Sequence, residues 1–158
     1  MQQRLFNLEQ HEQTSDDHYT PKWVFDKLGL EFDIDVASPP GGIPWIPTKR
    51  YYTMKDDGLA QPWEGTIWMN PPYSNSLPWV QRFIEHNNGI ALLPIVKSVW
   101  FQSLIEHSNT KCVLGTEDGR DRMDFHKGDK MHNIMFPVMF WAMGEKPIEA
   151  LHRLGRVR

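Results

Sequence analysis

The chain has 158 residues, enough for one compact domain with its own hydrophobic core. Hydrophobic residues make up 40% and aromatic residues 12% of the chain, which excludes an intrinsically disordered protein. The net charge of -3 argues against a protein that binds nucleic acid by electrostatic attraction alone, although a local basic patch could still contact DNA.

Cysteine content and hydropathy limit the metal chemistry and the compartment. The single cysteine, Cys112, excludes an internal disulfide and a cysteine-based zinc cluster. His126 and His132 do not form a tight histidine pair, so we expect no bound metal. No apolar run is long enough to span a bilayer and no signal peptide is evident, so we expect a cytoplasmic protein without a membrane contact.

The first part of the chain is predicted to be an arm followed by a helix. Residues 1–16 are rich in Gln, Glu and Asp and are expected to be flexible, whereas residues 17–158 form a single domain without repeats or linkers. Thr20 suits an N-cap and Pro21 suits the first helical position. A helix is therefore predicted over residues 21–28, ending at Gly29.

The next element is predicted to be a strand that ends at a cofactor loop. Apolar and acidic residues alternate over residues 31–36, which indicates a strand. Asp35 lies near its end and Ala37-Ser38 follow, the position at which a doubly wound sheet binds its cofactor. A carboxylate there suits a ligand ammonium group. Because Pro39 and Pro40 interrupt the expected glycine loop, an ordinary loop is the alternative interpretation.

Four prolines exclude a long helix over residues 38–50. A short strand is predicted over residues 50–53, and Asp56-Asp57-Gly58 has the composition of a turn. An apolar strand then leads into Asn70-Pro71-Pro72-Tyr73, which we call the Asn-Pro-Pro-Tyr turn. The strand should stop at Asn70, because neither proline can donate to a ladder.

The Asn-Pro-Pro-Tyr turn presents groups that suit a flat heterocycle with an exocyclic amine. The ring could stack on Tyr73, while its amino hydrogens go to the side-chain oxygen of Asn70 and the carbonyl of Pro71. Both acceptors are neutral, so they would orient the amine toward an electrophilic methyl group by positioning. A base in a duplex would have to be flipped out to reach them. The alternative is an ordinary proline turn that ends a strand.

The rest of the chain alternates helices and strands. Helices are predicted over residues 77–86 and after Ser98, a strand buried on both faces over residues 90–96, and a short strand over residues 111–115. This alternation predicts an α/β fold with a mostly parallel sheet. A strand over residues 122–126 is expected to pair with a long apolar strand over residues 133–143 as a C-terminal antiparallel hairpin. A short amphipathic helix over residues 147–154 precedes a basic tail.

The polar segment over residues 116–132 has two interpretations. It is either a solvated hairpin or a DNA-facing loop whose basic side chains contact phosphates. The candidate DNA-binding residues are Arg120, Arg122, Lys127 and Lys130.

An ordered series of motifs resembles the phage-type DNA N6-adenine methyltransferase (Dam-type) family over roughly residues 17–125. The motifs are Thr20-Pro21-Lys22-Trp23-Val24-Phe25, Phe32-Asp33-Ile34-Asp35-Val36-Ala37, Tyr51-Tyr52-Thr53, Asp57-Gly58-Leu59, Trp63 and the Asn-Pro-Pro-Tyr turn. The resemblance implies a trimmed Rossmann-like, S-adenosylmethionine-dependent methyltransferase domain. It implies that Asn70, Pro71, Pro72 and Tyr73 are catalytic. The implied cofactor-binding residues are Tyr19, Thr20, Pro21, Asp35, Ala37, Ser38, Asp57 and Asn70.

The expected function is therefore transfer of a methyl group from S-adenosylmethionine to the N6 amine of adenine in double-stranded DNA, in a bacterial or phage-infected host cell. The resemblance suggests GATC as the recognition sequence, read by a monomer or by a homodimer that covers a palindrome. Two alternatives remain. One is methyl transfer to RNA adenine, to cytosine N4 or to a protein glutamine, and the other is a non-catalytic nucleic-acid-binding decoy.

Overall fold

The computed structural model describes residues 19–114, 124–127, 130–133 and 137–158, so the predicted arm lies outside the described residues. Six strands form one sheet in the order β2-β1-β3-β4-β8-β5. They are β1 (Phe32–Asp35), β2 (Thr48–Tyr51), β3 (Ile67–Met69), β4 (Gly89–Pro94), β5 (Lys111–Leu114) and β8 (Val138–Met143). Strands β2, β1, β3 and β4 are parallel, whereas β8 is antiparallel to both of its neighbours. The predicted α/β class with a mostly parallel sheet is confirmed.

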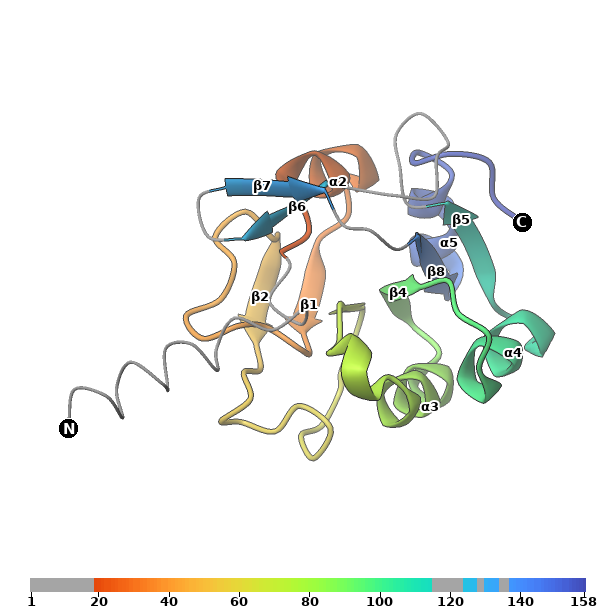
Figure 1. The fold of residues 1–158 in the computed structure, drawn as a ribbon, viewed down its shortest axis with the longest axis horizontal. Coiled ribbons are helices and arrows are strands. Elements are labelled where there is room, and N and C mark those ends of the chain that lie inside the picture. Colours follow the sequence, from red (N-terminus) through yellow and green to blue (C-terminus); the bar gives the residue numbers. More distant parts are fainter. Residues whose placement is uncertain (1–18, 115–123, 128–129, 134–136) are drawn as a thin grey trace.

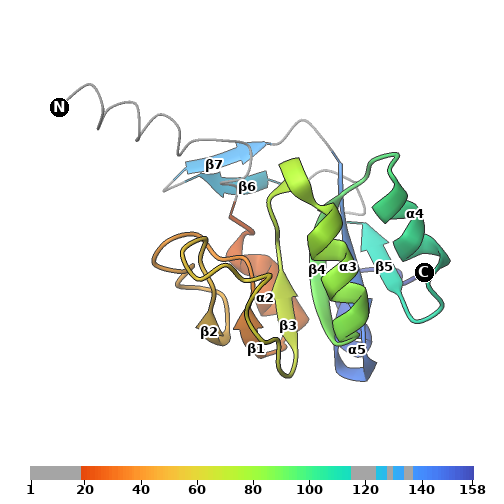
Figure 2. The same cartoon turned by 90° about the horizontal axis from the view of Figure 1, so that it is seen from below.

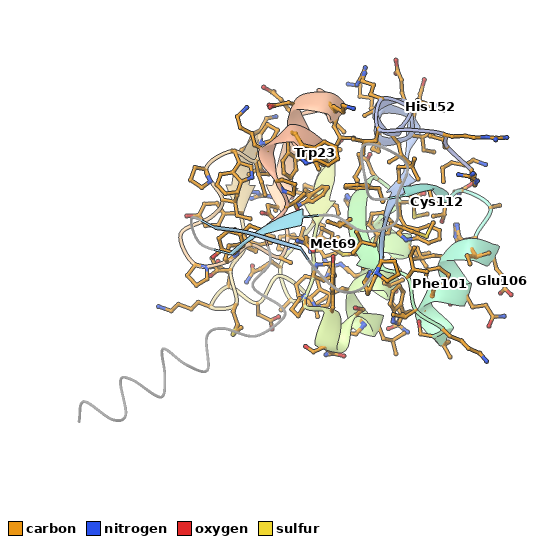
Figure 3. All side chains as sticks on the ribbon, turned by 45° about the horizontal axis from the view of Figure 1, so that its top comes forward. Trp23, Met69, Phe101, Glu106, Cys112 and His152 are labelled. Atoms are coloured by element: carbon orange, nitrogen blue, oxygen red, sulfur yellow. The ribbon has the colours of Figure 1, made fainter. Side chains whose placement is uncertain are left out.

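Helices cover both faces of the sheet (Figure 1). On one side lie α2 (Lys22–Leu28) and α5 (Glu145–Leu151), and on the other lie α3 (Leu77–His86) and α4 (Val99–Glu106). Each pair packs on its own buried cluster, so the sheet separates two cores. Figure 3 places Met69, the last residue of β3, near the centre of the molecule, with Glu106 and His152 at its periphery. No helix in the described ranges has the length and apolar character needed to cross a membrane.

Local sequence signals set most of the element boundaries. Gly29 ends α2 in the left-handed conformation, with φ 57°, and its N–H donates to the Phe25 carbonyl, as expected. Ser98 caps α4, because its hydroxyl accepts a hydrogen bond of 3.2 Å from the Phe101 N–H. All six residues of β4 are buried, but the strand ends at Pro94, two residues before the predicted end.

The start of α2 differs from the prediction. Its N-cap is Pro21, with φ -68° and ψ 151°, and no side chain caps the helix. Thr20 lies one residue further upstream and is fully buried. Its hydroxyl instead accepts a hydrogen bond from Asn70, a residue of the Asn-Pro-Pro-Tyr turn.

The connections between the first three strands contain turns, with no helix in residues 36–47 or 52–66. This confirms that the proline-rich segment does not form a long helix. Strand β2 lies two residues earlier than predicted, at Thr48–Tyr51. A short 3-10 helix, η1 (Tyr73–Asn75), then links the Asn-Pro-Pro-Tyr turn to α3.

The pairing expected for the C-terminal hairpin is wrong. Strand β6 (Asp124–Lys127) pairs with β7 (Lys130–Asn133), and β8 joins the main sheet between β4 and β5. Five of the six β8 residues are buried, and the strand is apolar on both faces. Such a strand is buried on both faces when it lies between two other strands of a sheet, as β8 does. Gly144, with φ 93°, turns the chain from β8 into α5, which begins two residues before the predicted helix.

Candidate active site

Two polar loops leave neighbouring parallel strands at the same edge of the sheet. From β1 the chain adds β2 on one side and β3, then β4, on the other, so the strand order reverses between β1 and β3. The Val36 N–H donates to the Trp68 carbonyl at 3.0 Å, which holds the β1 exit against β3. In α/β sheets, ligands bind outside the carboxyl ends of the strands at such a reversal.

The Asn-Pro-Pro-Tyr turn forms one side of this edge. Asn70 directly follows β3 and is half-buried, and Pro71 is buried. Pro72 adopts φ -57° and ψ 120°, and its carbonyl accepts a hydrogen bond from the Asn75 N–H at 3.3 Å. Strand β3 therefore ends at Met69, directly before Asn70 and the two prolines, as predicted.

Thr20 fixes the amide group of Asn70. The Asn70 Nδ2 donates to the Thr20 Oγ1 at 3.2 Å, across 50 residues of sequence. The Trp45 Nε1 donates to the Thr20 carbonyl at 2.8 Å and so holds the backbone of Thr20 in place. Because the two ends of an amide differ in hydrogen-bonding character, this contact defines where the Asn70 side-chain oxygen lies.

Tyr73 is joined to the neighbouring strand. Its hydroxyl donates to the Leu92 carbonyl of β4 at 3.3 Å, and its ring is half-buried against the core cluster on the α2 and α5 side. Burial raises the pKa of the Tyr73 phenol well above its usual range, so the hydroxyl keeps its proton. The turn is thus attached to α2 through Thr20 and to β4 through Tyr73.

Asp35 is a buried acid on the other side of the edge. Its side chain is 2% exposed, and burial raises its pKa to about 7 against the opposing hydrogen bonds from Ala37 and Ser38. The Ala37 N–H donates to the Asp35 carboxylate at 3.3 Å, and Ser38 is buried beside it. Within the described part of the chain no lysine or arginine forms a salt bridge with Asp35. A cationic ligand group would offset this burial.

A loop from β2 covers the end of β1. Gly58 lies so close to the Val36 carbonyl that a Cβ at this position would be 2.1 Å from the oxygen. Asp57 precedes it with φ 56° and is exposed. We call residues 52–66 the β2–β3 loop. Arg82 on α3 donates to two of its carbonyls, a contact that sequence reasoning missed because nothing in the local pattern around Arg82 indicates it.

The structure brings several of the predicted site residues together. Thr20 contacts Asn70 directly, while Asp35, Ala37 and Ser38 form the neighbouring loop. The half-buried Tyr19 and the buried Pro21 flank Thr20 at the start of α2.

The predicted DNA-binding residues fall on or before the β6–β7 hairpin. Lys127 and Lys130 pair with each other across the hairpin, and Arg120 and Arg122 lie outside the described residues. Figure 2 shows this hairpin beyond the end of the sheet from which the Asn-Pro-Pro-Tyr turn leaves β3. In the described ranges, no group of three or more His, Cys, Asp or Glu side chains could hold a metal.

These features indicate the class of protein: an α/β domain with a candidate ligand site at the carboxyl edge of its sheet. A profile of the family described as "DNA N-6-adenine-methyltransferase (Dam)" matches residues 8–135, and the chain belongs to this family. It is also similar to a protein named DNA N-6-adenine-methyltransferase from Haemophilus phage HP1 (strain HP1c1). The two are 32% identical over 100 residues, which cover 56% of this chain and 56% of the phage protein. The match thus spans about half the length of that relative.

Proposed function

We propose that this protein transfers a methyl group from S-adenosylmethionine to the N6 amine of adenine in DNA. The observation that carries the proposal is the Asn70 amide, oriented by the buried Thr20 at the carboxyl edge of the sheet. Its place beside the buried Asp35 loop and the family membership support the same conclusion.

In this proposal the Asn-Pro-Pro-Tyr turn holds the target base. An adenine flipped out of the duplex stacks on the ring of Tyr73, and its amino hydrogens go to the Asn70 Oδ1 and the Pro71 carbonyl. These neutral acceptors direct the lone pair of the amine, so their contribution is positioning and electrostatic stabilisation. Pro72 stiffens the turn. The tethers from Thr20 and Leu92 keep it in one conformation before the base arrives.

The methyl donor fits the other half of the edge. When bound, S-adenosylmethionine supplies an electrophilic methyl group. The Asp35 carboxylate suits its ammonium group, because a cation there offsets the cost of burying the acid. The same loop contains Ala37 and Ser38. The methionine end of the cofactor would be flanked by Tyr19, Thr20 and Pro21. The β2–β3 loop, which carries Asp57, would face the adenine of the cofactor.

Proton removal needs no strong base at the turn. The Tyr73 hydroxyl keeps its own proton and donates it to Leu92. The N6–methyl bond forms as the sulfur–methyl bond breaks, and the methylated amine, which is a strong acid, then releases its proton to water.

The DNA contacts and the fold type belong to the same proposal. The basic residues Arg120, Arg122, Lys127 and Lys130 would contact phosphates of double-stranded DNA. The strand order β2-β1-β3-β4-β8-β5, with β8 antiparallel, supports a trimmed Rossmann-like domain. A homodimer would allow the protein to cover a palindromic site.

The test uses the purified protein, S-adenosylmethionine with a labelled methyl group and unmethylated duplex DNA, followed by mass spectrometry of the nucleosides. We expect N6-methyladenine from the wild type and none from Asn70→Ala, which should keep its fold and most of its cofactor affinity. The matched control is Asn109→Ala, because Asn109 is exposed and precedes β5 at the opposite edge of the sheet. Label in cytosine would contradict the adenine assignment, and no label in DNA from a wild type that binds the cofactor would point to RNA or protein as the substrate. If the wild-type protein binds no cofactor, the alternative of a non-catalytic nucleic-acid-binding decoy would be favoured.

A further inference from the structure

The helix that follows the Asn-Pro-Pro-Tyr turn also holds the β2–β3 loop. Helix α3 begins at Leu77, directly after the turn and η1. One turn before its C-terminal end, the Arg82 guanidinium donates to the carbonyls of Leu59 and, at 2.7 Å, Gln61. It also lies over the ring of Trp63, with the guanidinium carbon 4.9 Å from the ring centroid. One side chain therefore makes three contacts with a single loop.

Further contacts extend this attachment along the loop. The Trp63 Nε1 donates to the Gly58 carbonyl at 2.8 Å, and the Trp63 ring stacks on Trp79 of α3 with centroids 6.4 Å apart. The His86 Nε2 lies 2.7 Å from the Gly65 carbonyl, near the end of the loop. Arg82 thus connects α3 through Trp63 to Gly58, the residue that packs on the Val36 carbonyl at the end of β1.

The position of the loop matters because Gly58 and Asp57 border the edge where Asp35 lies. The loop has turns and no helix of its own, so its conformation depends on contacts with its surroundings. A guanidinium with two carbonyl acceptors and an aromatic ring beneath it defines one arrangement of these segments. A looser loop would populate that arrangement for only part of the time.

We infer that Arg82 is a positioning residue that sets the affinity of the site for S-adenosylmethionine by holding the β2–β3 loop over the end of β1. This inference rests on the proposed function, because the loop is the predicted contact of the cofactor adenine. The same helix then supports both halves of the site: its first residues continue from the base-binding turn, and Arg82 holds the cofactor loop.

The test replaces Arg82 with Met, which keeps an apolar stem over Trp63 but removes the guanidinium, and with Lys, which keeps the charge but loses the paired donors. Binding of S-adenosylhomocysteine is measured by calorimetry. If the binding-competent loop is populated only about one tenth of the time in R82M, the apparent Kd rises roughly tenfold. We expect a smaller rise for R82K, and for both variants a kcat within about twofold of wild type at saturating cofactor.

The matched control is Arg153→Met. Arg153 also donates to a backbone carbonyl, that of Leu28 at 2.6 Å, but this contact joins the segment after α5 to the end of α2, next to the start of β1 at the opposite edge of the sheet. We expect R153M to lower the melting temperature without changing the Kd. An equal rise of the Kd in R82M and R153M, or an unchanged Kd in R82M, would overturn the role of Arg82.

Hydrogen exchange separates this inference from the proposed function. In the cofactor-free protein, R82M should speed exchange of the amides of Asp57 and Ala60, which donate within the loop, while β4 amides remain protected. Unchanged exchange of these loop amides in R82M would contradict the inference that Arg82 holds the β2–β3 loop in place. A wild type that binds no S-adenosylhomocysteine would contradict the proposed function, whatever the exchange result.

Discussion

Replacing Thr20 with Val tests whether the Asn70 amide is oriented by its neighbour. Val keeps the shape of Thr but removes the hydroxyl that accepts the Asn70 N–H at 3.2 Å. Because Thr20 is fully buried, no water can easily replace that acceptor. Ser in the same place keeps the hydroxyl and loses only a methyl group.

The size of the effect follows from one hydrogen bond. Loss of a neutral hydrogen bond with a buried group costs about 1 to 2 kcal/mol, which corresponds to roughly a fivefold to thirtyfold change in rate. We expect T20V to lower kcat by this factor, because an amide that rotates presents the wrong end to the amine. T20S should keep kcat within about twofold, although the lost methyl group costs about 1 kcal/mol of unfolding free energy.

The assay is steady-state methyl transfer to duplex DNA at saturating cofactor and DNA, with the Kd for S-adenosylhomocysteine measured in parallel. A lower kcat with an unchanged Kd supports the orientation of Asn70 by Thr20. A higher Kd with an unchanged kcat would refute this reasoning and would show that the Thr20 hydroxyl contacts the cofactor instead of orienting Asn70. An unchanged kcat and Kd would show that the hydrogen bond is dispensable.

Two further predictions concern Asp35 and Tyr73. The pKa of Asp35 is about 7 in the folded protein and about 4 in the unfolded chain, so the unfolded state releases the proton first and the wild type loses stability from about pH 4 to 7. The free energy of unfolding of Asp35→Asn, measured by thermal unfolding, should therefore rise by roughly 2 to 3 kcal/mol relative to that of the wild type between about pH 5 and 8. The cofactor affinity of this variant should fall. A difference in unfolding free energy that does not change with pH would contradict the raised pKa of Asp35. Tyr73→Phe loses the bond to Leu92 and should cost about 1 kcal/mol in urea unfolding, with methyl transfer retained. Tyr73→Ala should lose most activity, and equal losses in Y73F and Y73A would contradict stacking as the role of the ring.

Local chemistry explains why several elements could be predicted from the sequence. Gly29 ends α2, Ser98 caps α4, and the prolines after Met69 end β3. Each of these signals acts within a few residues, through a left-handed φ, a side-chain cap or a missing N–H. The uninterrupted apolar run of β4 likewise predicted a strand buried on both faces, which the structure confirms.

Pairings between distant segments could not be read from local pattern. The position of β8 between β4 and β5 depends on which strands have open edges, and the hairpin prediction instead paired it with its nearest neighbour in sequence. Thr20 had the composition of a helix cap, but its hydroxyl meets Asn70, because the sheet brings the start of α2 to the end of β3.

Local patterns in the sequence thus predicted the α/β class, the strand that ends at the Asn-Pro-Pro-Tyr turn and the residues proposed for the chemistry. The environment of those residues, in contrast, depends on the tertiary structure. The raised pKa of Asp35 comes from burial among segments that are distant in the chain, and the hold of Arg82 on the β2–β3 loop spans more than 20 residues. Burial and long-range contacts arise from packing of the whole chain, so no local pattern encodes them.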